Sequence, residues 1–220
     1  MTDQKTLTFL HTAPSHVARF DRLLAAHDLT ALRVQHHVNE ALLPHDGRLT
    51  DDLKRNALSI FMQLSSGADM VLCTCSTLGP VADIAAEMVD GRVWRIDRPM
   101  AQQALKAGQH ILVAACLAPS IMPTQLLLMA EADEAQLLPM ISPLIIEGAW
   151  QLFLDNNETA YAAAIAQAIK DAVKTTKPDA VILAQASMDC AEPLLNDCGV
   201  PVFSTPHIGV AAALDELGLI

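Results

Sequence analysis

The chain has 220 residues, of which 52% are hydrophobic and 18% charged, and its formal net charge is −11. This composition excludes a disordered chain, and an acidic balance without any basic run excludes the electrostatic attraction that holds proteins on nucleic acid. The most apolar stretch, residues 111–129, is interrupted by proline, serine, threonine and glutamine, so the sequence has no run of about 18 apolar residues that would indicate a membrane span.

Strands and helices are predicted to alternate along the chain. Apolar runs bounded by turn residues predict strands at residues 6–11, 30–36, 69–74, 92–96, 110–116, 140–146, 179–184 and 200–204. The segments between them predict helices at residues 15–27, 50–66, 79–89, 99–107, 121–130, 155–175, 189–197 and 207–217. Such alternation predicts an α/β fold, in which helices cover parallel sheets.

Three pairs of segments in the two halves of the chain are similar, in the same order and at similar offsets. Residues 8–15 match 113–120, residues 68–77 match 178–187, and residues 91–96 match 199–204. Three matches in one register indicate a duplicated α/β unit. We therefore predict two pseudo-symmetric, flavodoxin-like units, each a parallel sheet flanked by helices.

In parallel sheets, ligands bind beyond the carboxyl ends of the strands. The candidate site residues are therefore those that directly follow the predicted strands. They are His11-Thr12, Cys75-Ser76-Thr77, Cys116 to Ser120, Gln185-Ala186-Ser187 and Thr205-Pro206-His207.

Cys75 is the leading catalytic candidate. It follows a predicted buried strand and precedes a helix that begins near Gly79-Pro80. A helix N-terminus stabilises a thiolate and presents free N–H groups to an anion such as a carboxylate. The alternative is that Cys75 is a small buried hydrophobe, as most free cysteines are.

The other cysteines are predicted to be structural, and the cysteine pattern also bears on the cellular compartment. Cys73 is interpreted as core, with a redox or metal role as the alternative, and Cys190 and Cys198 as structural. The five cysteines form no C-x-x-C pair, and the first residues lack the apolar core of a signal peptide. Together these features predict reduced thiols and a cytoplasmic protein.

The chain resembles the aspartate/glutamate racemase superfamily, the cofactor-independent group that includes hydantoin racemases, maleate isomerases and arylmalonate decarboxylases. Cys75-Ser76-Thr77 after a buried strand is similar to the family's first Cys-Asn-Thr motif, and residues 181–187 stand at the place of the second motif. The resemblance implies an active site between the two units. It also implies that the C-terminal helix returns to the first unit, which gives boundaries of 1–97 plus 207–220 and 98–206.

One departure from the family determines the predicted chemistry. In the family, two thiols act on opposite faces of the carbon alpha to a carboxylate or carbonyl. The resemblance carries the first onto Cys75 and the second onto Gln185, and the internal repeat matches the same two residues. An amide exchanges hydrogen bonds but cannot act as an acid or base near neutral pH. A one-thiol isomerase or lyase acting on a small carboxylate or dicarboxylate is therefore predicted.

Two alternatives stay open: a carboxylate-binding protein without activity, and a racemase with a second acid other than cysteine. By position, the predicted substrate contacts are His11, Thr12, Ser76, Thr77, Ser120, Thr124, Gln185, Ala186, Ser187 and His207. His11 and His207 are also candidate acid or base groups, although a lone histidine after a strand is more often structural. A homo-oligomer is a further open expectation.

No cofactor is predicted, because neither G-x-G-x-x-G nor G-x-x-x-x-G-K-[ST] occurs. His36, His37 and His45 could suggest a metal, but the segment between them resembles a loop at a strand end, and no metal site is predicted.

Overall fold

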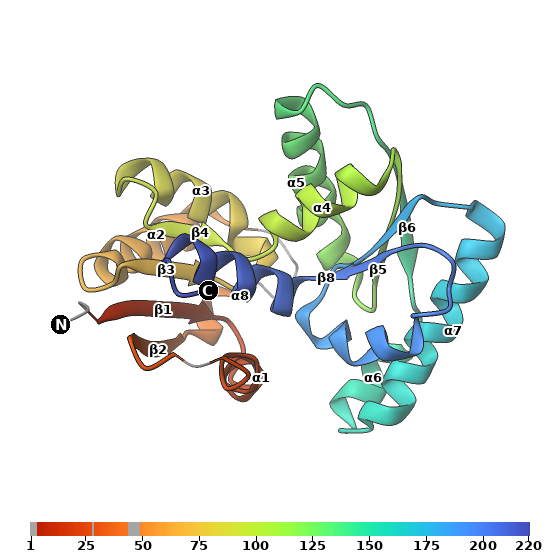
Figure 1. Cartoon of the computed structure of the whole chain (residues 1–220), viewed down its shortest axis with the longest axis horizontal. Helices are drawn as coiled ribbons and strands as arrows, with labels where there is room; N and C mark the ends of the chain where they lie inside the picture. The colour runs from red at the N-terminus through yellow and green to blue at the C-terminus, as the bar shows by residue number, and fades with distance from the viewer. Residues whose placement is uncertain (1–3, 28, 44–48) are drawn as a thin grey trace. The chain divides into compact units, whose positions relative to one another are not determined.

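Each half of the chain builds a four-stranded sheet with the same strand order. The computed structural model describes residues 4–27, 29–43 and 49–220 (Figure 1). The first sheet has the order β2-β1-β3-β4 and consists of β1 (Lys5–His11), β2 (Leu32–Val38), β3 (Met70–Cys73) and β4 (Val93–Arg95). The second has the order β6-β5-β7-β8 and consists of β5 (His110–Ala115), β6 (Met140–Ile145), β7 (Ala180–Leu183) and β8 (Val202–Ser204).

All neighbouring strands in both sheets run parallel. The predicted α/β fold, with a helix-flanked parallel sheet in each unit, is therefore confirmed. The first unit comprises Met1–Asp97 with Gly209–Ile220, and the second comprises Arg98–Ile208.

Helices cover both faces of each sheet. In the first unit, α2 (Asp51–Ser65) and α3 (Gly79–Met88) pack on one face, and α1 (Ser15–Leu24) and the end of α8 (Thr205–Glu216) pack on the other. In the second unit, α4 (Arg98–Ala107) and α5 (Ile121–Glu134) cover one face. Its other face packs against α6 (Ala149–Leu154) and α7 (Glu158–Thr176) (Figure 1). The central strands β3 and β7 are buried throughout.

Short 3-10 turns follow several strands. They are η1 (Glu40–Leu42), η2 (Ser76–Leu78), η3 (Ala118–Ser120) and η4 (Ala186–Leu194). The predicted α-helix at 189–197 is wrong, since η4 occupies much of this segment. Pro193 lies within it, and proline can neither donate a backbone hydrogen bond nor fit the interior of an α-helix.

The predicted helix at 155–175 has a later start than expected, and a separate helix precedes it. Helix α6 ends at Leu154, and the Asn157 side chain then caps α7 by accepting the Ala160 N–H at 3.1 Å. Thr50 caps α2 in the same way through the Leu53 N–H. Both asparagine and threonine are favoured at this position because their oxygens bind free N–H groups of the first turn.

The paired strands show which residues of the two units are equivalent. Leu10 lies opposite Cys73 in the first sheet, and Ala114 lies opposite Leu183 in the second. Cys75 and Gln185 each follow two residues after these partners, as the sequence match places them. On the neighbouring strands β1 and β5, the equivalence differs by one residue from the sequence match of 8–15 with 113–120. In the structure Thr12 is equivalent to Cys116, because they lie two residues after Leu10 and Ala114 respectively.

Within the described ranges, no helix combines the length and apolar character that crossing a bilayer requires.

Candidate active site

Cys75 lies at the carboxyl end of the first sheet. It is half-buried, precedes η2 and packs against the core beneath α2 and α3. Its carbonyl accepts the Leu78 N–H at 3.0 Å and the Cys73 thiol at 3.4 Å. The half-buried Ser76 and Thr77 form the turn itself, and α3 begins at Gly79, as predicted. A three-residue turn therefore separates the thiol from the α-helix.

A buried cation lies close to this turn. The Arg95 side chain is 4% exposed and donates to both carboxylate oxygens of Asp97, at 2.7 and 3.1 Å, and to Asp83 at 3.1 Å. A Cβ at Gly79 would lie 2.4 Å from the Arg95 guanidinium, so any other residue at the start of α3 would displace the guanidinium. The guanidinium thus packs directly against the segment that carries Cys75. Sequence reasoning missed this group because the three side chains converge only in the folded sheet.

His11, at the end of β1, belongs to a chain of hydrogen bonds that reaches the surface. The Thr74 hydroxyl donates to the Leu10 carbonyl at 3.0 Å, so its oxygen accepts from His11 Nδ1 at 2.8 Å. His11 Nε2 then accepts from His36 Nδ1 at 2.8 Å.

At the outer end of this chain, His36 Nε2 lies 3.1 Å from the Asp21 carboxylate, which can only accept. The chain therefore ends on the exposed Asp21 carboxylate, with His36 between Asp21 and His11. His11 is assigned the neutral form with its proton on Nδ1. Both of its ring nitrogens are therefore engaged within the first unit.

His11 should make the first unit sensitive to acid. Burial, with smaller effects from His16 and His36, lowers the pKa of His11 from 6.5 to about 3. Between these values the unfolded chain binds a proton that the folded chain excludes, so stability falls as the pH is lowered. Between pH 7.5 and pH 5 the loss should be about 2 kcal/mol.

Urea unfolding at several pH values, monitored by Trp94 fluorescence in a Trp150→Phe background, measures this dependence for the first unit. His11→Gln removes the titrating group and should flatten the curve. Parallel curves for the two proteins over this pH range would show that His11 does not set the acid sensitivity.

Gln185 occupies the corresponding position in the second unit. Its side-chain oxygen accepts the backbone N–H of Cys116 at 2.6 Å and that of Leu117 at 3.1 Å. Within a carboxamide, the oxygen can accept hydrogen bonds and the NH₂ group cannot. The two N–H contacts therefore fix which way the Gln185 carboxamide is turned. The Gln185 NH₂ group lies on the other side of the carboxamide and can act only as a donor.

A buried polar group lies beside Gln185. The Tyr161 hydroxyl bonds the Ser187 hydroxyl at 3.1 Å and is hydrogen-bonded to the Cys116 thiol. Burial raises the pKa of both Cys116 and Tyr161, so both keep their protons at neutral pH. Sequence analysis placed Ser187 in the site but overlooked Tyr161, which lies in the first turn of α7 and gives no local signal.

The remaining predicted contacts lie at the same strand ends. Thr12 is buried in the first unit. In the second, Thr124 is buried and donates to the Ser120 carbonyl at 3.1 Å, and Ala186 is half-buried at the start of η4. His207, in the first turn of α8, lies 3.4 Å from Glu192.

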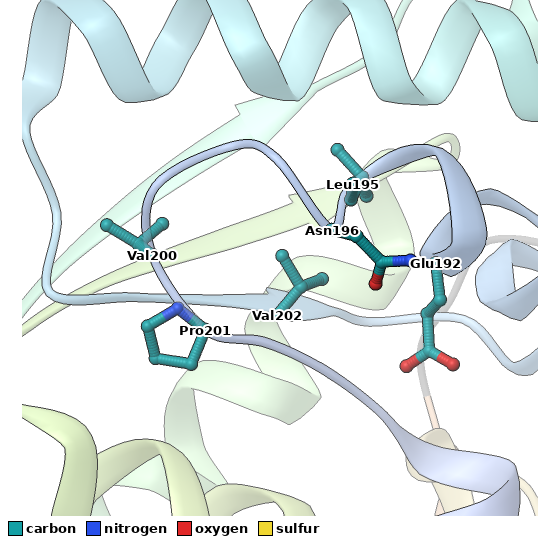
Figure 2. A pocket seen from close by; sticks show the side chains of 6 residues that line it. All are labelled: Glu192, Leu195, Asn196, Val200, Pro201 and Val202. Carbon is teal, nitrogen blue, oxygen red and sulfur yellow. The ribbon is translucent and has the colours of Figure 1, made fainter.

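A pocket of about 330 Å³ lies elsewhere on the second unit, between the end of η4 and the start of β8 (Figure 2). Burial raises the pKa of Glu192, which lies at the opposite end of the labelled residues from Val200 in Figure 2. The pocket contains none of the predicted site residues. It is lined by Glu192, Leu195, Asn196, Val200, Pro201 and Val202.

In the part of the chain that the structure describes, no three His, Cys, Asp or Glu side chains gather in a way that could hold a metal ion. His36 is engaged by His11 and Asp21, and His45 lies outside the described residues.

Comparison with known proteins provides an independent view of the chain. The sequence model of the Asp/Glu/Hydantoin racemase family matches residues 9–213. No protein with a curated description matches the sequence.

Several solved structures share the fold. Allantoin racemase from Pseudomonas fluorescens has a TM-score of 0.63 at 16% identity, over 97% of this chain and 92% of that one. Glutamate racemase from Francisella tularensis in complex with D-glutamate has a TM-score of 0.66 at 10% identity, over 99% and 84%. A mutant of arylmalonate decarboxylase in a sulfate-associated form has a TM-score of 0.63 at 16% identity, over 97% and 93%. At these identities the likeness shows the fold alone.

Proposed function

This chain belongs to the Asp/Glu/Hydantoin racemase family, and from that premise we propose that it is a cofactor-independent isomerase or lyase acting on a small carboxylate, with Cys75 as its only catalytic thiol. One observation carries the proposal. Cys75 and Gln185 follow equivalent strands at the same position, and only one of them can exchange a proton.

A single thiol supports chemistry on one face of the substrate. In a lyase reaction, the bond between the alpha carbon and a carboxylate breaks, carbon dioxide leaves, and the electron pair stays on the alpha carbon. The Cys75 thiol donates its proton to that carbon, and solvent reprotonates the thiolate. In an isomerase reaction on an unsaturated acid, the thiolate adds to the double bond, the new single bond rotates, and elimination restores the thiolate.

Neutral donors are the proposed carboxylate ligands. Ser76, Thr77 and Ser120 are half-exposed at the strand ends, and the Gln185 NH₂ group can only donate. The buried Arg95 is already paired with Asp97 and Asp83, so it supplies no free positive charge. D-glutamate, which one similar structure contains, is a carboxylate of the proposed size.

A carboxylate-binding protein without turnover is the second candidate. It is favoured by Gln185, whose side-chain oxygen accepts the N–H groups of Cys116 and Leu117 and whose carboxamide cannot act as an acid or base near neutral pH.

Alkylation with ligand protection tests the proposal. Iodoacetamide should modify Cys75 faster than the other four cysteines, and malonate, maleate or D-glutamate should slow only that reaction, as measured by mass spectrometry of each cysteine. Cys198 is the matched control, because it is also half-buried. Equal alkylation of Cys75 and Cys198 without protection would contradict the catalytic role of Cys75.

Turnover separates the two candidates. An enzyme converts the protecting carboxylate and loses that conversion in Cys75→Ala, whereas a binding protein shows protection without conversion. In either case Gln185→Ala should weaken protection by about 5- to 150-fold, which corresponds to the 1–3 kcal/mol of a lost hydrogen bond.

A further inference from the structure

Helix α5 of the second unit presents an apolar stripe to solvent. Met122, Leu126 and Met129 are 66%, 55% and 59% exposed, and Ala130 beside them is exposed as well. Their spacing of four and three residues places them along one face of the helix. Between residues 121 and 130, every exposed side chain of the helix is apolar. We define Met122, Leu126, Met129 and Ala130 as the α5 stripe.

The equivalent helix in the first unit shows that the fold does not require such a surface. Helix α1 follows β1 as α5 follows β5, but its exposed residues are Ser15, Ala18, Asp21 and Arg22. The duplicated position is therefore mostly polar in one unit and apolar in the other. Adjacent large apolar side chains on a surface mark interaction sites more often than isolated ones do.

The charged residues of α5 are placed unfavourably with respect to its helix dipole. Its first turn contains no acidic residue, and no side chain caps its N-terminus. Its last turn carries the exposed Asp133 and Glu134 and no basic residue. Acidic groups are favourable near a helix N-terminus and unfavourable near a C-terminus. An antiparallel copy of the same helix would reverse this, because each acidic end would meet the positive end of its partner.

We propose that the α5 stripe is the dimer interface of this protein, in which a second copy of the chain packs antiparallel about a two-fold axis through Leu126. Around that axis Leu126 meets Leu126 of the second copy, and Met122 meets the Met129–Ala130 region. Asp133 is seven residues, or about 10.5 Å, further along the helix. It then lies over residue 119 of the partner, in η3 directly before α5, and faces the N-terminal end of that helix, where backbone N–H groups are free of intrahelical partners. A single patch that is complementary to itself is what a two-fold dimer requires.

Sedimentation of the full chain over a range of concentrations tests the interface. The wild-type chain should form a dimer, and Leu126→Glu should raise its dissociation constant at least 100-fold, because two carboxylates would meet on the axis. Leu154→Glu is the matched control, since Leu154 is also 55% exposed in the second unit, and it should leave the dimer intact. A wild-type chain that stays monomeric, or a dimer that Leu126→Glu leaves unchanged, would overturn the proposal.

Two further variants test the geometry, and they keep the proposal testable if Leu126→Glu does not fold. Leu126→Cys should be linked to its copy by a short bifunctional maleimide, whereas Leu154→Cys and the wild-type chain should not. Asp133→Lys should weaken the dimer, whereas Asp171→Lys on the exposed face of α7 should not. A dimer without cross-linking at position 126 would exclude the two-fold axis. None of these results depends on activity, so they are independent of the proposed reaction.

Discussion

Replacing Cys75 with serine is expected to lower kcat about 10³-fold or more, equivalent to roughly 4 kcal/mol of activation free energy. A serine hydroxyl releases its proton far less readily than a thiol and is a weaker nucleophile, so both proposed reactions lose their reacting group. The measurement uses whichever small carboxylate protects Cys75 from alkylation. Cys198→Ser, in a turn of the second unit, is the control and should retain wild-type kcat.

The product formed in deuterium oxide adds a stereochemical readout. If the reaction is the lyase reaction on a substrate with two different alpha substituents, deuterium should enter the alpha carbon on one face only, and the product should be a single enantiomer. Retention of more than a tenth of kcat in Cys75→Ser would remove Cys75 from the reaction. A racemic, deuterated product from the wild-type chain would instead indicate a second acid, which is the alternative left open by the sequence.

Removing the charge of Arg95 is expected to cost about 3–5 kcal/mol of stability in the first unit, because Arg95→Met leaves the Asp97 carboxylate, 5% exposed, buried without its main partner. Urea unfolding followed by Trp94 fluorescence in a Trp150→Phe background measures this cost. Arg55→Met removes an exposed ion pair with Asp52 and should change stability by less than about 0.5 kcal/mol.

A double variant keeps this prediction testable if Arg95→Met fails to fold. Replacing buried ion pairs by apolar residues is often close to neutral, so Arg95→Met with Asp97→Leu should recover much of the loss. A cost below about 1 kcal/mol for Arg95→Met alone would mean that Asp97 finds other partners. Because the guanidinium packs against Gly79, the same variant should also loosen the start of α3, next to the segment that carries Cys75.

The sequence by itself was sufficient for the features that depend on local pattern. The spacing of apolar residues and the turn residues predicted the eight strands, and all eight are observed. The internal repeat paired Cys75 with Gln185, and the strand register places both at the same position. These inferences worked because buried parallel strands leave continuous apolar runs, and the residues that follow them are identified by position alone. Pro193 shows the limit, since a helix was predicted across it and a 3-10 turn formed instead.

Only the tertiary structure determined which polar groups meet. The Asp21–His36–His11–Thr74 chain, the Arg95 pairs with Asp83 and Asp97, and the contact between Gln185 and the N–H groups after β5 join residues from different elements. The spacing within one element gives no information about such partners. The tertiary structure also determined which face of α5 is exposed. A mostly apolar helix shows no polar face in its sequence, so only the packing shows which of its faces the sheet covers.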